Sequence, residues 1–179
     1  MKKEDHLVPN AILAAALVSL FLLAFPSKSP AATPELKPAL ASLAYFSGDW
    51  DCSGKFDVSG KTIEAHQHFE TELDGAWMTF RHDDKPPFAY HALSEWGWDA
   101  AQKKFVMLAQ DSAGGARLFY SSGWDSALLQ WDGDAVGSTS SPTQRFSFER
   151  LDDRHFKVSY FTLKNNVWSR MDASTCSKL

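Results

Sequence analysis

From Gly48 onward, hydrophobic and polar residues alternate with a period of two over short stretches of the chain. In the first stretch, Trp50, Cys52, Gly54 and Phe56 alternate with charged or small polar residues. Such alternation is typical of a half-buried strand, because successive side chains of a strand point to opposite faces of the sheet. The stretch is therefore predicted to be the first strand of a sheet.

Further stretches of the same character follow, separated by residues that favour turns, such as Asp74–Gly75, Asp83–Asp84 and Asp132–Gly133–Asp134. About ten short strands at regular spacing indicate a sandwich or an up-and-down barrel. The tight turns favour a meander in which each strand pairs with the next, so we predict the barrel. The stretches after the first span residues 63–73, 76–82, 89–98, 105–110, 117–122, 128–131, 143–151, 156–162 and 167–175.

In one segment, residues 34–46, the spacing of apolar residues is typical of a helix. Leu36, Leu40 and Leu43 recur at intervals of four and three residues and give one apolar stripe. Thr33 is a suitable N-cap for this segment. We predict a short helix that precedes the first strand and covers one end of the barrel.

The start of the chain has the layout of a secretory signal peptide. A short basic start leads into an apolar stretch at residues 11–25, and small residues and prolines follow. The apolar stretch is shorter than the roughly 20 residues that a bilayer-spanning helix needs. We predict cleavage after Ala31, with 1–31 as signal peptide, 32–47 as linker and capping helix, and 48–179 as the barrel domain. The location is then periplasmic or secreted; the alternative is an uncleaved N-terminal membrane anchor.

Composition limits the classes of partner. The chain has 179 residues, a net charge of −4 and a pI near 5.8. A nucleic-acid-binding domain usually has a basic patch and a high pI, so no nucleic acid is predicted as a partner. Beyond the N-terminal anchor alternative, no membrane contact is predicted, and the sequence does not set the oligomeric state.

The two cysteines, Cys52 and Cys176, lie near the two ends of the predicted barrel domain. In an oxidising compartment such a pair usually forms a disulfide. A closed meander places the first and last strands side by side, which agrees with a bridge between these residues. The alternative is a reduced pair that binds metal or acts in catalysis.

The stretch Gly48–Gly54, with its Gly-x-Trp-x-x-x-Gly pattern after a short helix, resembles the start of lipocalin-like, or calycin, barrels. The stretches Leu73–Trp77, Glu95–Phe105 and Ser122–Gly133 extend the resemblance to a bacterial family of domains of unknown function with that fold, distantly similar to nitrobindin-type barrels. The resemblance implies an all-β, antiparallel up-and-down lipocalin-like barrel with a cavity for a small apolar ligand. It also implies a structural role for Trp50 at the closed end.

The predicted function is non-enzymatic binding of a small hydrophobic or amphipathic molecule. Many aromatic residues fall on the predicted strands, where they fill the core or line a cavity, and ligand pockets are mostly apolar with a few polar groups. The alternatives are an enzyme built on the same barrel, and a filled barrel that serves as a protein-interaction module; no catalytic residue is assigned. The predicted ligand-binding residues are Arg81, His91, Trp96, Arg117, Phe119 and Arg145.

No cofactor is predicted; two histidine patterns are the weak candidates for a metal or haem. His66 and His68 share one face of a strand and are weak metal candidates, because the opposite face is apolar and the histidine face therefore points to solvent. Haem needs an axial histidine directed into the cavity, and in nitrobindins it comes late in the chain. Here the late histidine is His155, with His91 as the second candidate.

Overall fold

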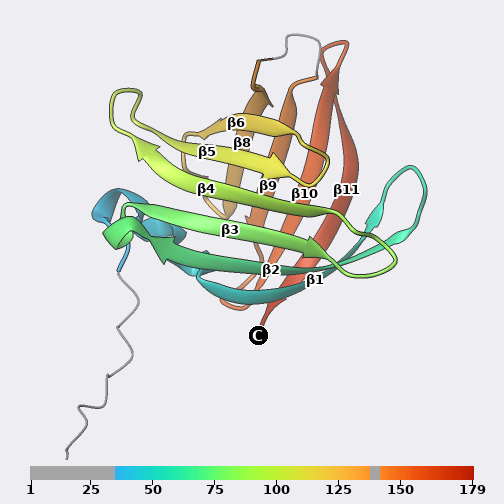
Figure 1. The fold of residues 1–179 in the computed structure, drawn as a ribbon, viewed down its shortest axis with the longest axis horizontal. Helices are drawn as coiled ribbons and strands as arrows, with labels where there is room; N and C mark the ends of the chain where they lie inside the picture. Colours follow the sequence, from blue (N-terminus) through green and yellow to red (C-terminus); the bar gives the residue numbers. More distant parts are fainter. Residues whose placement is uncertain (1–34, 138–141) are drawn as a thin grey trace, which may run out of the picture. The chain divides into compact units, whose positions relative to one another are not determined.

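The computed structural model describes residues 35–137 and 142–179, which belong to one compact unit. They form an antiparallel sheet that closes into a barrel (Figure 1). Nearly every strand pairs with the next along the chain, and the first strand pairs with the last, which confirms the predicted all-β meander barrel. The predicted signal peptide, residues 1–31, lies outside the described residues and stays a prediction.

The wall of the barrel consists of ten strands, because β7, with two residues, is a short addition to the eleven-stranded sheet and β6 pairs directly with β8. The strands are β1 (Gly48–Phe56), β2 (Thr62–Glu72), β3 (Trp77–Asp84), β4 (His91–Asp99), β5 (Lys104–Asp111), β6 (Ala116–Ser121), β7 (Trp124–Asp125), β8 (Leu128–Ala135), β9 (Gln144–Arg150), β10 (His155–Lys164) and β11 (Val167–Lys178).

The predicted turn Asp132–Gly133–Asp134 is wrong, because these residues continue β8. Gly133 permits this, since β6 approaches so closely that a Cβ atom at Gly133 would lie 2.2 Å from the backbone oxygen of Leu118. Asp132 faces outward from the strand, where its carboxylate accepts hydrogen bonds from Arg145. A glycine and two carboxylates therefore serve here as strand residues.

The predicted turn Asp83–Asp84 is likewise part of a strand, at the end of β3. Asp83 faces outward and accepts a hydrogen bond from His91 on β4 (2.7 Å). Asp84 faces inward, and its side chain is 7% exposed. Each of the two carboxylates has a histidine partner, so both acidic residues are accommodated within the strand.

The predicted helix is shorter than expected and is a 3-10 helix, η1 (Pro38–Phe46), followed later in the chain by a single 3-10 turn, η2 (Leu73–Gly75). η1 begins at Pro38, whose fixed φ suits the first turn of a helix. Leu40 and Leu43 are buried as predicted, while the expected N-cap Thr33 lies outside the described residues. Among the described residues, no helix has the length and apolar character needed to cross a membrane.

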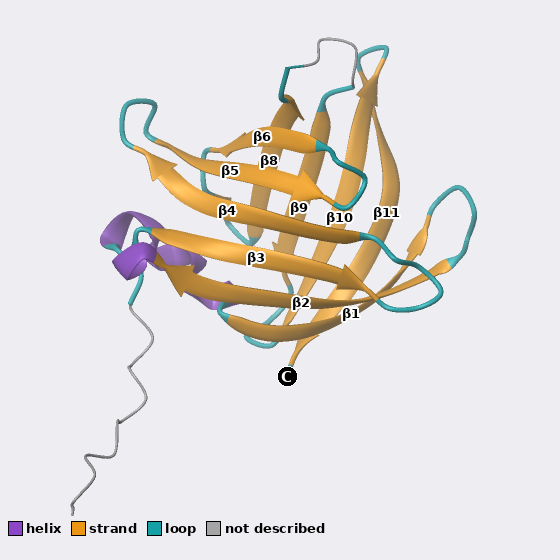
Figure 2. Cartoon of the chain, viewed as in Figure 1, coloured by secondary structure: helices purple, strands orange, loops and turns teal. Residues whose placement is uncertain are grey.

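η1 covers one end of the barrel, where β3 begins and β4 ends (Figure 2). Phe46 reaches into the barrel and contacts Phe156, Phe148 and Trp96, with ring centroids 5.4–5.5 Å apart. Trp50 donates a hydrogen bond from Nε1 to the carbonyl of Phe46 (2.6 Å). All five side chains are 0–1% exposed, so aromatic rings fill this end of the barrel.

The disulfide between Cys52 and Cys176 is present, as predicted. The two residues lie directly opposite each other on β1 and β11, the strands that close the barrel. Their sequence separation of 124 residues makes the loop-closure contribution large, about 5 kcal/mol in the chain-entropy model. The bridge therefore favours the closed barrel.

Candidate ligand-binding site

The end of the barrel away from η1, called the open end below, differs from the filled end. Phe80, Ala109, Phe146 and Val158 point inward and pack on the core, yet each is only partly buried. An inward apolar side chain keeps solvent exposure only where water enters the barrel. These four residues therefore form an apolar floor that is accessible from the open end.

Polar and charged side chains surround the open end above this floor, and we call them the open-end cluster. Most of its members occupy inward positions of the wall, two or four residues from buried core residues of the same strand. Tyr90 comes from the loop between β3 and β4, and its ring centroid lies 5.9 Å from that of His82. The cluster comprises His82, Asp84, Tyr90, Asp111, Arg117, Tyr160 and Asp172.

Arg117 is the central cation of the cluster. It lies on β6 two residues before the buried Phe119, and its neighbours in the adjacent strands are Ala109 and Ala135, whose small side chains leave it room. Its Nη1 atom is buried and has no hydrogen-bond partner among the described residues. A buried charged donor without a partner is costly, and such groups are rare unless they serve a function or meet water or a ligand.

Two tyrosines lie near this guanidinium. Although Tyr90 is 43% exposed, partial burial raises its pKa to about 12, and Asp111 and Tyr160 raise it further while Arg117 opposes the change. Burial also raises the pKa of Tyr160, again with Arg117 acting in the opposite direction. Both phenols therefore keep their protons at neutral pH and serve as hydrogen-bond donors.

Two of the three carboxylates in the cluster already have partners. Oδ1 of Asp111 accepts hydrogen bonds from the backbone N–H groups of Ala113 and Gly115 in the turn after β5, each at 2.9 Å. Asp84 lies 2.8 Å from Nε2 of His82, and the other ring nitrogen of His82 contacts Gln67 at 3.1 Å. These carboxylates are directed at their own partners and leave Arg117 unpaired.

Asp172, on β11 opposite Tyr160, is the third carboxylate. Its pKa is raised from 3.8 to about 6, chiefly because burial penalises the charged form. His82 lowers the pKa, the negative charges of Asp57 and Asp84 raise it, and Arg170 lowers it. Arg170 is itself paired with Asp57 (2.8 Å), so it compensates Asp172 only in part.

The open end thus combines an apolar floor with a donor-rich rim. Arg117, Tyr90 and Tyr160 can donate hydrogen bonds to a ligand, and Asp172 can do so when it is protonated. Such an arrangement suits a molecule with an apolar body and an acceptor-bearing head, because pockets for small molecules are largely apolar with a few directed polar groups.

Among the six predicted ligand-binding residues, the structure places one, Arg117, at the open end. Arg81 and His91 lie exposed on the outer wall. Arg145 also faces outward, where it binds Asp132 and stacks over Trp168 at 4.0 Å. Trp96 and Phe119 point inward but are 0% exposed, so they belong to the packed core.

The histidines considered as metal or haem ligands all have carboxylate partners on the outer surface. His66 and His68 both contact Asp49, at 3.1 and 2.7 Å. His155 contacts Asp152 at 2.9 Å, and residue 155 precedes the inward Phe156, so its side chain faces away from the interior. Within residues 35–137 and 142–179, no group of three or more His, Cys, Asp or Glu side chains is placed to hold a metal ion.

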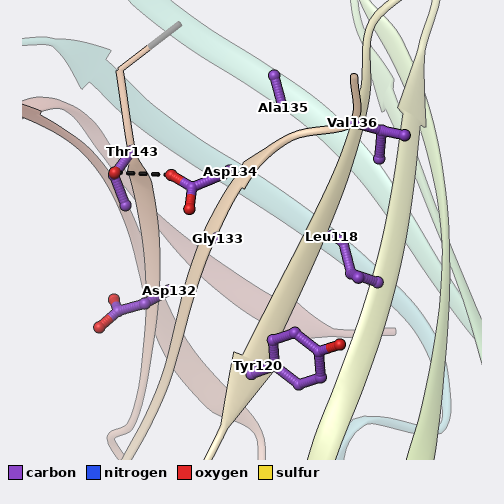
Figure 3. A pocket seen from close by; sticks show the side chains of 8 residues that line it. All are labelled: Leu118, Tyr120, Asp132, Gly133, Asp134, Ala135, Val136 and Thr143. Atoms are coloured by element: carbon purple, nitrogen blue, oxygen red, sulfur yellow. Dashed lines mark hydrogen bonds between the residues drawn. The ribbon is translucent and has the colours of Figure 1, made fainter. Parts of the chain in front are cut away.

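Two shallow hollows, of about 410 and 440 Å³, lie on the outer wall on either side of Tyr120. Figure 3 shows the first, where Asp134 accepts a hydrogen bond from Thr143 (2.7 Å). Leu118 and Tyr120 alternate with the inward Phe119, so these hollows face away from the barrel interior. Neither contains a buried polar atom without a partner, as far as the described residues show, and neither matches the open end in chemistry.

The predicted ligand-binding residues include Arg117 but no other member of the open-end cluster; Tyr90, Tyr160 and Asp172 are the missed residues that matter most for binding. A signal for Tyr160 is present, since it continues the alternation of Phe156 and Val158 on the inward face of β10. Asp172 lies beside a register shift, where β10 residues 160 and 161 pair with β11 residues 172 and 170, so simple alternation does not carry across this point. Tyr90 precedes β4 in the structure, but the predicted strand over residues 89–98 includes it in phase with the buried Ser94 and Trp96, and that phase is its signal.

No protein-family model matches the chain, and no curated protein matches it. Two solved structures are similar to part of it. One is EF1p2_mFAP2b bound to DFHBI, with a TM-score of 0.36 and 12% identity over 77% of this chain and 97% of that chain. The other is a redesigned beta barrel, mFAP1, bound to DFHBI, with a TM-score of 0.36 and 12% identity over 76% and 98%. At these values the similarity carries no argument about the function of this chain.

Proposed function

We propose that the protein binds a small hydrophobic or amphipathic molecule inside the open end of the barrel. One observation carries this proposal: inward apolar residues such as Phe80, Phe146 and Val158 stay accessible to solvent beside the buried, unpartnered Nη1 of Arg117. Both features raise the free energy of the empty protein, and a bound amphipathic molecule relieves both. Transport, sequestration and sensing are all compatible with such binding.

The place of action that we propose is the periplasm or the cell exterior. The Cys52–Cys176 disulfide supports an oxidising compartment, and the signal peptide predicted for residues 1–31 supports export. Membership of the bacterial lipocalin-like family that the sequence resembles remains part of this proposal.

Binding of N-phenyl-1-naphthylamine, a neutral dye that fluoresces in apolar surroundings, tests the proposal. The wild-type protein is expected to bind it, and Ala109→Trp is expected to weaken binding at least about tenfold, because the added ring fills the accessible floor. Leu108→Trp is the matched control, since residue 108 is adjacent on the same strand but faces outward. Circular dichroism melts establish that both variants fold, and Ala92→Phe, nearer the rim, replaces Ala109→Trp if that variant is unfolded.

Equal binding by the wild type and by Ala109→Trp, or by its replacement Ala92→Phe, would contradict the interior site. Absence of any binding by the folded wild type would contradict the proposed function and leave the ligand-free interaction module as the function to test.

An enzyme is the second candidate, and Asp172 is the observation that favours it. A carboxyl whose pKa is raised to about 6 inside a solvent-accessible interior is suited to act as a general acid or base. Native mass spectrometry of the protein purified from an oxidising periplasm identifies any bound molecule. Conversion of that molecule by the wild type, but not by Asp172→Asn, would establish the enzyme; an unchanged mass after incubation would support binding alone.

A further inference from the structure

The rim of the open end has an excess of hydrogen-bond donors over free acceptors. Arg117 has a buried Nη1 without a partner among the described residues. The protonated phenols of Tyr90 and Tyr160 lie close enough to this guanidinium for its charge to act on both. Three donors, from β6, the β3–β4 loop and β10, thus lie around the open end of the barrel.

No carboxylate of the described residues forms an ion pair with Arg117 at the open end. No carboxylate of the described residues lies within 4.0 Å of the Arg117 guanidinium, although Arg145, Arg150 and Arg170 all have such partners. Asp111, which is near enough to influence both tyrosines, directs Oδ1 at the backbone of its own turn. The buried Nη1 atom of the half-buried Arg117 therefore has no counter-charge among the described residues, and a bound anion would supply one.

We propose that Arg117, together with Tyr90 and Tyr160, forms a subsite for the negatively charged head of an amphipathic ligand. The inference deepens the binding function proposed above and rests on it. A carboxylate, sulfonate or phosphate group accepts charge-assisted hydrogen bonds from a guanidinium, and these are the strongest that such a rim offers. The ligand class is accordingly an apolar molecule, flat or chain-like, with one anionic group.

The geometry of the wall explains how one molecule reaches both parts of the site. Arg117 pairs across the strands with Ala109, a floor residue, and Tyr160 pairs with Phe146, another floor residue. The ring centroids of Phe146 and Tyr160 are 5.2 Å apart, so rim and floor are in direct contact. A head group at Arg117 therefore leaves the apolar body of the ligand against the floor.

Asp172 opposes this subsite when it is ionised. It lies directly across from Tyr160, and its negative charge would repel an anion bound there. Replacing it with asparagine keeps the shape and removes the charge, so anion binding is expected to tighten. Arg117 and Asp172 thus have opposite predicted effects on the same ligand.

Two related dyes distinguish the contribution of the anionic head group to binding from that of the apolar body. N-phenyl-1-naphthylamine and 1-anilinonaphthalene-8-sulfonate share the same ring system, and the second carries a sulfonate. The wild type is expected to bind the sulfonate more tightly. Arg117→Met, which keeps an apolar stem, is expected to weaken sulfonate binding about 10- to 100-fold and to leave the neutral dye within about twofold. Asp172→Asn is expected to tighten sulfonate binding at about pH 8 by severalfold.

Arg81→Met is the matched control, because Arg81 is exposed on the outer face of β3 and is expected to leave both affinities unchanged. Retained binding of the neutral dye shows that the Arg117 variant is folded. Competition adds a natural head group: displacement of the sulfonate dye by decanoate or decyl phosphate, and much weaker displacement by decanol, supports the subsite.

The outcomes distinguish this inference from the function on which it rests. If neither dye binds the folded protein, the binding function itself fails. If both dyes bind equally, or if Arg117→Met and Arg81→Met affect the sulfonate alike, the barrel binds apolar molecules and the anionic subsite is overturned.

Discussion

Replacing Asp172 with asparagine is expected to stabilise the folded protein at neutral pH and to change its stability little near pH 4. The pKa of this carboxyl rises from 3.8 to about 6 on folding, mainly through burial. The folded state therefore holds the proton more tightly than the unfolded chain does, and ionisation opposes folding. The resulting penalty is absent below about pH 4, grows between about pH 4 and 6, and is complete above that range.

The size of the effect follows from the same two values. A tenfold change in proton affinity corresponds to about 1.4 kcal/mol, so a move from 3.8 to about 6 corresponds to about 3 kcal/mol. Because solvent reaches this half-buried side chain, about 2 kcal/mol is the expected gain for Asp172→Asn at neutral pH. The gain should shrink toward zero as the pH falls to about 4.

Urea unfolding of the wild type and Asp172→Asn at about pH 4, 6 and 8, followed by tryptophan fluorescence, measures this difference. The difference between the two proteins isolates residue 172 from other carboxyls such as Asp49, whose pKa is lowered by hydrogen bonds from His68 and His66. Asp125→Asn, at an exposed position of β7, is the control and is expected to change stability by less than about 0.5 kcal/mol. A gain that is the same at every pH, or a loss at neutral pH, would refute the reasoning.

Three further predictions concern the packing of the barrel. The double variant Cys52→Ser/Cys176→Ser should lose up to about 5 kcal/mol of unfolding free energy. A melting temperature of the wild type that does not change when a reductant is added would contradict this. Phe46→Ala should destabilise by about 3–5 kcal/mol in urea unfolding because it leaves a cavity among six aromatic rings; a loss below about 1 kcal/mol would be inconsistent with the filled end. Gly133→Ala should cost about 2 kcal/mol or more, since its Cβ would lie 2.2 Å from the Leu118 carbonyl oxygen, and an equally stable variant would disprove that approach.

Local pattern was sufficient to predict the wall of the barrel. Alternation around Trp50 and Cys52 reports a half-buried strand wherever one face meets the core, and both residues are buried as expected. Asp132 and Gly133 mark the limit of such reasoning. Turn propensity describes what a short stretch prefers alone, whereas the pairing of β8 with β6 and the ion pair with Arg145 hold these residues in a strand.

The candidate site was less predictable, because it depends on which residues share the inside of one end of the barrel. Arg117 was among the predicted residues, but sequence alone did not separate it from Arg81 and Arg145, which face outward. Trp96 was expected at a ligand and is instead buried beneath η1 with its Nε1 bonded to Ser94 (3.0 Å). The sequence predicts a helix over one end of the barrel, but which inward residues of each strand lie beneath it depends on the register of the whole barrel, and no local pattern gives that.

A crystal structure of the protein with 1-anilinonaphthalene-8-sulfonate bound tests the central claim most directly. The account predicts the ring system inside the open end against Phe80 and Phe146, with a sulfonate oxygen within hydrogen-bond distance of Nη1 of Arg117. A dye seated in the outer hollows beside Tyr120, with the barrel interior unchanged, would contradict it.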